Sequence, residues 1–391
     1  MLDLLRGAGP AGLGRAELAA RAGLTPQAVS KITARLAADG LIAEAGRAAS
    51  TGGKPRTLLR LIPEARHAVG VHMDRDELRA VRVDLAGRVV AESRGPLDFG
   101  AGPEAAVEAV VRAVARVKDP TGLPLLGVGV AAPGPLDYRA GAMGRVTGYP
   151  SWKSFPLRGV LEGRLGLPVL LDKDTNAGAV AAAGAWLRAA WPDADADADA
   201  DAGAGVGAGA FVAADVGGGV GVGLSAGAGV GAGPGVDAYA GDGPHTCVYL
   251  HVGTGLGAGL WLRGGVYRGA RSAAGEFGHQ VLLLDGPPCR CGARGCVEVL
   301  CLGAVARGEL SEAARILGEA AANLVALLDV DRVLLGGRVV AAAPDVFVAE
   351  VGAVLAARAL DPARPVVALA GAGVAEGAAE MALAPLFGRA G

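Results

Sequence analysis

GEFGHQVLLLDGPPCRCGARGCVE, residues 275–298, holds three of the five cysteines of the chain together with one histidine and two glutamates. Clustered cysteines form disulfides in oxidising compartments, whereas in reducing ones they more often bind metal or do redox chemistry. The segment is therefore a disulfide knot, a redox centre, a metal site or part of a binding pocket, and the rest of the chain has to separate these possibilities.

Composition favours a reducing compartment. The 391 residues (38.5 kDa, 52% hydrophobic) suffice for two or three globular units. The first twenty residues contain no long apolar run behind a basic leader, and no stretch of about 18 large apolar residues suggests a membrane span. We therefore expect a cytoplasmic protein without a membrane partner, whose cysteines stay reduced.

Charge is distributed unevenly along the chain. Residues 1–66 carry ten Lys and Arg against five Asp and Glu, a net charge of +5, and the remainder carries −7. We call residues 1–66 the head and the remainder the body. A basic head next to an acidic body indicates a polyanionic partner for the head alone.

The head has the pattern of a helix-turn-helix. A helix is expected over Arg15–Ala22, a turn at residues 23–24, and a second helix with Thr25 as N-cap and Pro26 in the first position. Val29 and Leu36 share the apolar face of that second helix. Its other face is expected to meet the DNA major groove, through Thr25, Gln27, Ser30, Lys31 and Arg35.

Two strands around a basic loop, residues 41–62, predict a wing that adds Lys54 and Arg56 to the DNA-binding residues. The alternative is a small helical subdomain whose cations are only solvated. Agreement of the turn residues, the apolar spacing and the basic wing favours a winged helix-turn-helix DNA-binding domain over residues 1–66.

Strands and helices alternate through residues 67–391, which predicts an α/β domain with helices covering a sheet. A meander of strands begins at residue 67, and a buried strand at 169–171 leads into a helix near Thr175. Residues 192–244 are Asp/Ala-rich and then Gly/Ala-rich, so we expect an insert that is mostly disordered and has no ligand role.

The chain resembles the ROK family, named for repressors, open reading frames and sugar kinases, and within it the repressor branch. The resemblance covers nearly the whole length. It rests on the order of a set of short motifs: STGGKPRTLL, GVGVAAPGPLD, DKDTNAGA, HVGTGLGAGL, AAGEFGH and CRCGARGCVE. It implies an actin-like ATPase fold, in which two α/β lobes close on a sugar cleft.

The resemblance also implies a structural zinc site in the opening segment. The ligands carried over from the family motif are His279, Cys289, Cys291 and Cys296, a donor set suited to a closed tetrahedral site. A reactive dithiol is the rival, but Cys-x-Cys is poor redox spacing. Cys247 and Cys301 lie outside the motif and are expected to be buried thiols.

A sugar pocket follows from the same resemblance. Glu276, His279 and Glu298 match sugar-binding positions, and Asp174 matches the catalytic base of the kinases. Lys173 stands where the family usually has Asn, so either the ligand differs, for example by carrying phosphate or carboxylate, or sugar binding is weakened.

The first nucleotide loop departs further from the family. In place of Asp-x-Gly-x-Thr the sequence has His72, Asp74 and Asp76, followed by Glu77. Carboxylates repel a triphosphate and the loss of glycine closes the turn, so we expect no kinase activity and regard Asp174 as a vestigial base.

These observations predict a DNA-binding transcriptional regulator, most simply a repressor, that binds operator DNA as a homodimer or higher oligomer and senses a sugar, a sugar phosphate or another sugar derivative. An ATP-dependent sugar kinase with a fused DNA-binding head is the alternative. A third possibility is a constitutive DNA-binding protein whose cleft serves only for dimerisation.

Overall fold

The computed structural model of the protein describes residues 1–47, 56–118, 122–189, 246–359 and 365–389. All of them belong to one packed unit of the chain, Met1–Trp191 and Gly243–Gly391. The predicted insert at 192–244 and the wing residue Lys54 lie outside the described residues. The domain boundary at residue 66 stays a prediction: it falls directly before a strand that begins at His67.

Helix, turn and helix follow one another in the head as predicted. Helix α2 (Arg15–Ala22) ends at Gly23, whose φ of 62° is in the left-handed region that favours glycine. Helix α3 (Pro26–Ala38) is capped by the Thr25 hydroxyl, which accepts a hydrogen bond from the Ala28 amide at 3.3 Å. Both boundaries are set by residues next to them in the sequence, which explains why local rules found them.

Short antiparallel strands complete the head. β2 (Ile42–Arg47) pairs with β3 (Thr57–Leu61), and β1 (Leu13–Gly14) pairs with the other edge of β3. The preceding helix α1 (Leu2–Gly7) closes a small core with α2 and α3, in which Leu5, Leu18 and Val29 are fully buried.

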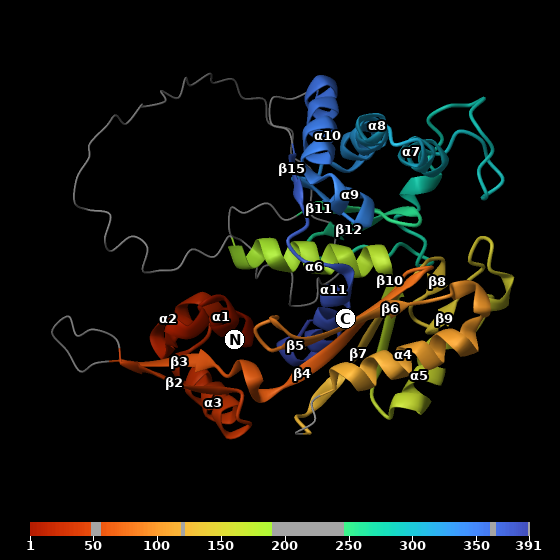
Figure 1. Ribbon diagram of the computed structural model, residues 1–391. Helices are drawn as coiled ribbons and strands as arrows, with labels where there is room; N and C mark the ends of the chain where they lie inside the picture. The colour runs from red at the N-terminus through yellow and green to blue at the C-terminus, as the bar shows by residue number, and fades with distance from the viewer. Residues whose placement is uncertain (48–55, 119–121, 190–245, 360–364, 390–391) are drawn as a thin grey trace, which may run out of the picture. The chain divides into compact units, whose positions relative to one another are not determined.

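The head is also joined to the C-terminal helix α11 (Val374–Leu383). Arg6 of α1 forms a bidentate ion pair with Glu380 of α11, and both side chains are almost fully buried. Ala375 and Ala379 of the same helix belong to the apolar cluster of the head. Figure 1 shows α11 beside β4 and β5, close to the head.

The first of two five-stranded sheets has the order β10-β7-β4-β5-β6. β4, β5 and β6 form the predicted antiparallel meander, whereas β4, β7 and β10 run parallel. Helices α4 (Pro103–Val117) and α5 (Leu157–Leu165) cover it and share its apolar core. Its strands are β4 (His67–Met73), β5 (Glu77–Asp84), β6 (Val89–Pro96), β7 (Leu125–Ala132) and β10 (Val169–Lys173).

The second sheet has the order β13-β12-β11-β14-β15 and begins with the predicted glycine hairpin between β11 and β12. Helices α7 (Val297–Ala306), α8 (Leu310–Leu328) and α10 (Pro344–Arg358) pack against it. Its strands are β11 (Cys247–Val252), β12 (Leu256–Leu262), β13 (Gly265–Val266), β14 (Arg332–Gly336) and β15 (Val366–Leu369).

Helix α6 (Asp174–Ala189) links the two sheets. It follows β10 directly, packs on β11 and β12, and lies against α11, which in turn packs on β4 and β7 (Figure 1). The approach of α6 and α11 depends on glycine, because a Cβ at Gly377 would meet the Ala177 carbonyl oxygen at 1.8 Å.

The remaining elements are short. They are the strands β8 (Leu136–Asp137) and β9 (Ala142–Met143), helix α9 (Arg338–Ala342), and the 3-10 helices η1 (Gly9–Ala11), η2 (Pro63–Ala65), η3 (Phe99–Ala101), η4 (Pro150–Trp152), η5 (Phe277–His279) and η6 (Ala384–Phe387).

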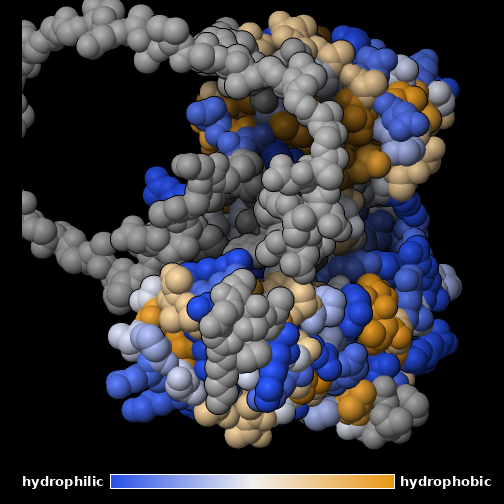
Figure 2. Space-filling model, turned by 90° about the vertical axis from the view of Figure 1, so that its left-hand side faces the viewer, coloured by the Kyte–Doolittle hydropathy of each residue, from blue (hydrophilic) through white to orange (hydrophobic). Residues whose placement is uncertain are grey.

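Hydrophilic residues are spread over the face drawn in Figure 2, between smaller apolar areas. Within the described ranges, no helix combines the length and the apolar character needed to cross a bilayer.

Candidate functional site

A pocket of about 780 Å³ opens where the first sheet meets the β11–β12 hairpin. The carboxyl ends of β4, β7 and β10 point to it, which is the edge of a parallel sheet where α/β proteins bind ligands. All five predicted ligand-binding residues line it: Lys173, Asp174, Glu276, His279 and Glu298.

Lys173 is buried, and its charge is already compensated within the protein. Its Nζ lies 3.3 Å from Oε1 of Glu276 and also donates to the Ala274 carbonyl oxygen. The close fit extends to Gly134, where an added Cβ would lie 2.8 Å from Cδ of Lys173. The cation that replaces the usual Asn therefore forms part of the pocket wall.

Asp174 is the first residue of α6, one position earlier than the helix start expected at Thr175. Its Oδ1 accepts a hydrogen bond from the adjacent Thr175 amide at 2.6 Å. An N-cap side chain accepts instead from an amide two or three residues on, so this bond is not the predicted capping contact. Burial raises the pKa of Asp174, and nearby His251 offsets part of that shift. A carboxyl group of this kind is suited to proton exchange with a bound hydroxyl.

Asp172, a residue that the sequence analysis missed, fixes the junction between β10 and α6. Its buried carboxylate accepts hydrogen bonds from Arg268 Nε, from Asn176 Nδ2 and from the Lys173 amide, each at 2.7 Å. The Arg268 guanidinium in turn lies over the ring of Tyr138. This network holds Lys173 and Asp174 at the pocket.

Two histidines, His72 and His251, lie beside these acids. Their rings meet edge to face with centroids 5.9 Å apart, and Nδ1 of His251 is 2.9 Å from the Tyr249 hydroxyl. Burial, together with the neighbouring charge of His251, lowers the pKa of His72 to about 3. Asp74, Arg79 and Arg338 are the other charged groups that act on it. His251 was given no role from the sequence, although it opens the motif HVGTGLGAGL.

The loop between β4 and β5, where the first nucleotide loop was expected from the sequence, is bonded to the second half of the chain through its own side chains. The Thr254 hydroxyl donates to Asp74, Nη1 of Arg75 donates to the Thr254 carbonyl oxygen at 3.2 Å, and Asp76 pairs with Arg338 at 2.8 Å. Burial alone would raise the pKa of Asp74, but hydrogen bonds from Thr254 and from the Arg75 amide lower it below its usual value. The carboxylates expected to repel a triphosphate thus have partners inside the protein.

Glu298 and Glu276 approach the pocket from the second half of the chain. Glu298 lies in the first turn of α7, and its Oε2 accepts the Leu256 amide at 3.0 Å. Glu276 precedes the 3-10 helix η5, which ends at His279, so the two side chains leave the same short turn. Each carboxylate keeps acceptor capacity for a ligand hydroxyl.

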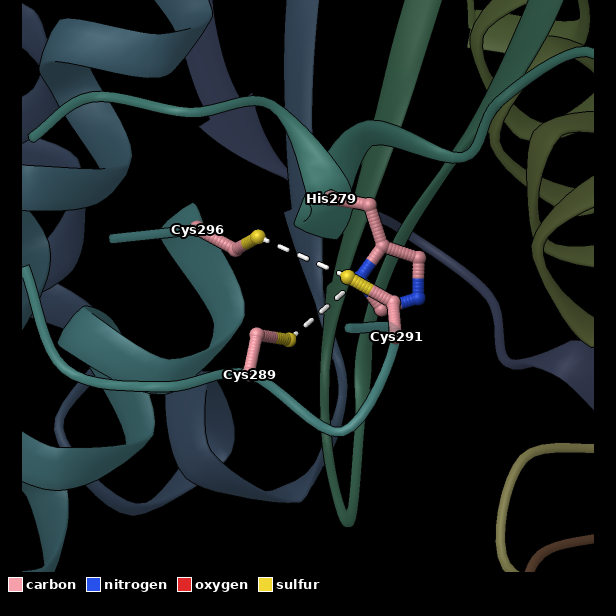
Figure 3. Close-up of side chains that lie close together, drawn as sticks. All are labelled: His279, Cys289, Cys291 and Cys296. Atoms are coloured by element: carbon pink, nitrogen blue, oxygen red, sulfur yellow. Dashed lines mark hydrogen bonds between the residues drawn. The ribbon is translucent and has the colours of Figure 1, made fainter. Parts of the chain in front are cut away.

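The predicted metal ligands converge. One donor atom each from His279, Cys289, Cys291 and Cys296 lies within 4.8 Å of every other, and Figure 3 shows the four side chains pointing toward one another. Sγ of Cys291 is 3.7 Å from Sγ of Cys296, and Sγ of Cys289 is 3.8 Å from Nδ1 of His279. Tetrahedral bonds of about 2.3 Å separate sulfur ligands by about 3.8 Å, so the cluster has the size of a metal site.

Cys247 and Cys301 are buried away from this cluster, as predicted. Burial raises the pKa of both thiols to about 12, which makes them unreactive packing residues.

The predicted DNA-binding residues of the head are exposed. This holds for Thr25, Gln27, Ser30, Lys31, Arg35 and Arg56. The Arg35 side chain is 86% exposed, and the Asp39 carboxylate lies 4.0 Å from it. The outer face of α3 is therefore available to a partner.

Comparison with known proteins gives one family. The sequence model of the ROK family matches residues 68–241 and 235–307. A putative xylose repressor from Caldicellulosiruptor sp. (strain Rt8B.4) is 25% identical over 291 residues, which is 73% of this chain and 59% of that relative. The chain spans 59% to 61% of the length of the curated repressors it matches.

Solved structures agree with the fold. The crystal structure of a ROK family transcriptional regulator, a homolog of the E. coli MLC protein, superposes with a TM-score of 0.66 over 98% of this chain and 96% of its own, at 17% identity. A ROK hexokinase from Thermus thermophilus superposes with a TM-score of 0.56 over 82% of this chain and 99% of its own, at 27% identity. The predicted actin-like α/β fold is confirmed.

Proposed function

The chain belongs to the ROK family, and on that premise we propose that it is a DNA-binding transcriptional repressor that releases its operator when a sugar or sugar derivative binds. The observation that carries this proposal is that one chain combines an exposed basic recognition helix with a polar pocket of the sugar-binding kind. Neither feature alone distinguishes a regulator from an enzyme.

The DNA-binding half of the proposal rests on α3. Lys31 and Arg35 project from a helix whose opposite face is held by the core of the head, so their positions are fixed before DNA is met. A preformed helix with cations on its free face suits the major groove. Gln27 can donate or accept hydrogen bonds at base edges, and Ser30, whose hydroxyl donates to the Pro26 carbonyl oxygen, can accept one.

The sensing half rests on the pocket. Glu276, Glu298 and Asp174 offer carboxylate oxygens, and these accept hydrogen bonds from sugar hydroxyls. The Caldicellulosiruptor relative is named for xylose. We therefore propose an aldose or an aldose derivative as the effector.

We propose zinc as the resident metal of the cluster formed by His279, Cys289, Cys291 and Cys296. The donor set and the spacing of the sulfur atoms fit a closed structural site without an open position for substrate. When bound, the metal would fix the loop that carries Cys289 and Cys291 and hold the His279 ring at the edge of the pocket.

We propose that the chain does not transfer phosphate from ATP. Side chains fill the first nucleotide loop, and Asp74 and Asp76 place carboxylates where a triphosphate would need donors. The retained Asp174 and the likeness to a hexokinase favour a sugar kinase as the second candidate.

The proposal includes assembly. A single small head makes too few contacts for tight specific binding, so we propose that the chain binds a two-fold symmetric operator as a homodimer or a higher oligomer. A regulator acts where the chromosome lies, and the cytoplasmic location predicted from the sequence is part of this proposal.

The test begins with selection of DNA duplexes from a random pool by the purified full chain. The selected duplex is then labelled, and its binding is followed by fluorescence anisotropy while xylose, glucose and their phosphates are added. The proposal predicts a symmetric consensus sequence and loss of DNA binding with at least one sugar.

Two outcomes contradict the proposal separately. If no duplex is enriched, the proposed DNA binding is contradicted. Enrichment followed by binding that no sugar or sugar derivative alters sinks the sensing half and leaves a constitutive DNA-binding protein.

A further inference from the structure

Arg75 is a guanidinium in the pocket without an anionic partner. It lines the cavity and is half-buried, and its side chain donates from Nη1 to the Thr254 carbonyl oxygen at 3.2 Å. In the part of the chain that the structure describes, no carboxylate lies within ion-pair distance of it. Most of its N–H donors are therefore free to meet a ligand.

The neighbouring acid does not neutralise this cation. Asp74 is engaged by the Thr254 hydroxyl and by the backbone amide of Arg75, so the loop orients its carboxylate toward the hairpin. Asp76 is paired with Arg338. Both acids of the loop thus have other hydrogen-bond partners, and neither forms an ion pair with Arg75.

Arg75 lies next to the sugar-binding carboxylates. A Cβ at Gly255 would lie 3.3 Å from Nη2 of Arg75 and 3.2 Å from Oε2 of Glu298, so both groups flank the same glycine. A ligand whose hydroxyls bind Glu298 therefore brings its next substituent to the guanidinium.

The other charged residues of the pocket include further cations without an ion pair to a described residue. Lys173 is neutralised by Glu276, and burial raises the pKa of Asp174. Arg145 and Arg290 also line the pocket, are exposed, and have no ion pair among the residues described. The cavity thus has three cations without an ion pair among the residues described, Arg75, Arg145 and Arg290, and the carboxylates of Glu298 and Asp74 face them.

We propose that Arg75 anchors an anion subsite, so that the effector is a sugar bearing a phosphoryl or carboxylate group, an inference that rests on the proposed sugar-sensing function. A partly buried guanidinium without a counter-ion is costly, and a phosphate or carboxylate that binds it in bidentate fashion recovers that cost. The substitution in the sequence that suggested an anionic ligand was Lys173, whereas the structure gives this role to Arg75.

The first arm of the test uses inorganic phosphate, which requires no knowledge of the sugar. Thermal unfolding of the full chain is measured with phosphate and with chloride at equal ionic strength, in wild type, in Arg75→Gln and in Arg116→Gln. Arg116 is an exposed arginine of α4 outside this pocket, so its variant controls for charge alone. Phosphate should stabilise the wild type and Arg116→Gln but not Arg75→Gln. Equal phosphate stabilisation of all three, or of none, overturns the proposal.

The second arm uses calorimetric titration with matched ligands: glucose, glucose 6-phosphate, glucuronate and the xylose equivalents. In wild type the anionic member of a pair should bind at least about ten-fold tighter than the neutral member, a difference of about 1.4 kcal/mol. Arg75→Gln should reduce that ratio to about one and leave the affinity for the neutral sugar unchanged.

Other results of the second arm identify which idea fails. Neutral sugars that bind and release DNA with no preference for anionic ones overturn the anion subsite and leave sugar sensing intact. Binding of no sugar by a chain that still binds DNA overturns sensing and the subsite together. Arg75-dependent binding of ATP that is tighter than that of any anionic sugar assigns the guanidinium to a nucleotide and overturns the proposal.

Discussion

Nζ of Lys173 lies 3.3 Å from Oε1 of Glu276, across 103 positions of sequence. The lysine side chain is 3% exposed and the glutamate side chain 45% exposed, so one partner is buried and the other reaches the pocket. The pair joins the end of β10 in the first sheet to the turn before η5. The sequence suggested that Lys173 alters the ligand specificity. In the structure it also joins two segments of the pocket wall.

The first prediction concerns this pair. Glu276→Gln removes the charge that balances the buried ammonium and leaves it with neutral acceptors such as the Ala274 carbonyl oxygen, so the change should destabilise the wild type more than it destabilises Lys173→Met. We expect a coupling energy on the order of 1–2 kcal/mol, below that of a fully buried pair because Glu276 is half exposed. Chemical denaturation of the four proteins of the cycle measures it, and additive effects would show that the two charges do not interact.

The helices of the head could be predicted from local sequence rules, whereas the charge pairing in the pocket could not. Thr25 and Pro26 specify the start of α3 through bonds to residues at most three positions away, so the sequence pattern contains the whole interaction. Arg75 instead meets Thr254, 179 positions away. Whether a charge in a pocket is free or compensated depends on such distant partners, and no periodicity in the sequence encodes them.

The order of the family motifs predicted which residues line the pocket, but not what they do there. Lys173 and Glu276 were both expected at the ligand, and both line the cavity, yet part of their capacity is used on each other. Asp172 and His251 open two of the quoted motifs, DKDTNAGA and HVGTGLGAGL, but the motifs gave them no role, and their contacts became visible only when β10, α6 and the hairpin were placed together. Their roles remain predictions.

The second prediction concerns α3. Arg35→Ala should weaken binding to the selected duplex by about 1–3 kcal/mol if the side chain reads a base, and Lys31→Ala should lower the slope of log affinity against log salt by about one if it contacts phosphate. Anisotropy titrations at several salt concentrations measure both. Arg116→Ala on α4 is the matched control. A flat salt response, with wild-type affinity in both variants, would sink the DNA-binding assignment.

The third prediction is the absence of phosphoryl transfer. Full-length protein incubated with ATP, Mg²⁺ and a panel of hexoses and pentoses should form no sugar phosphate above the level of Asp174→Ala, because Asp74 and Asp76 occupy the loop that would hold the triphosphate. Coupled detection of ADP and chromatography of the sugars check this. Robust turnover that Asp174→Ala abolishes would make the kinase the better assignment.

The fourth prediction is a pH dependence of stability caused by His72. Its folded-state pKa is lowered to about 3 by burial, against about 6.5 in an unfolded chain. Between these values the unfolded chain binds more protons, so the stabilisation is complete above about pH 6.5 and declines as pH falls, by up to about 1.4 kcal/mol per pH unit. His72→Gln should flatten the slope between pH 6.5 and 5. Denaturation midpoints at several pH values test it, and an unchanged slope in a variant that is stable at pH 7.5 would refute it.

The last prediction links the metal to the pocket through His279. Nδ1 of this histidine faces the cysteine cluster while the residue also lines the cavity, so one imidazole can hold metal at one nitrogen and a ligand at the other. Loss of metal frees the loop of Cys289 and Cys291 and lets the ring rotate. Cys291→Ala should therefore lose the metal, lower effector affinity by about ten-fold or more, and abolish effector-driven release from DNA.

The control is Cys301→Ala, because Cys301 is a buried thiol outside the cluster. It should retain metal and effector binding even if its stability falls. Coupling must also be reciprocal: DNA should weaken effector affinity by the factor by which effector weakens DNA affinity, and that factor should approach one in Cys291→Ala. Metal analysis with calorimetric titration of both ligands decides the matter, since an unchanged effector affinity in a metal-free variant would mean that the metal stabilises its loop without acting on the pocket.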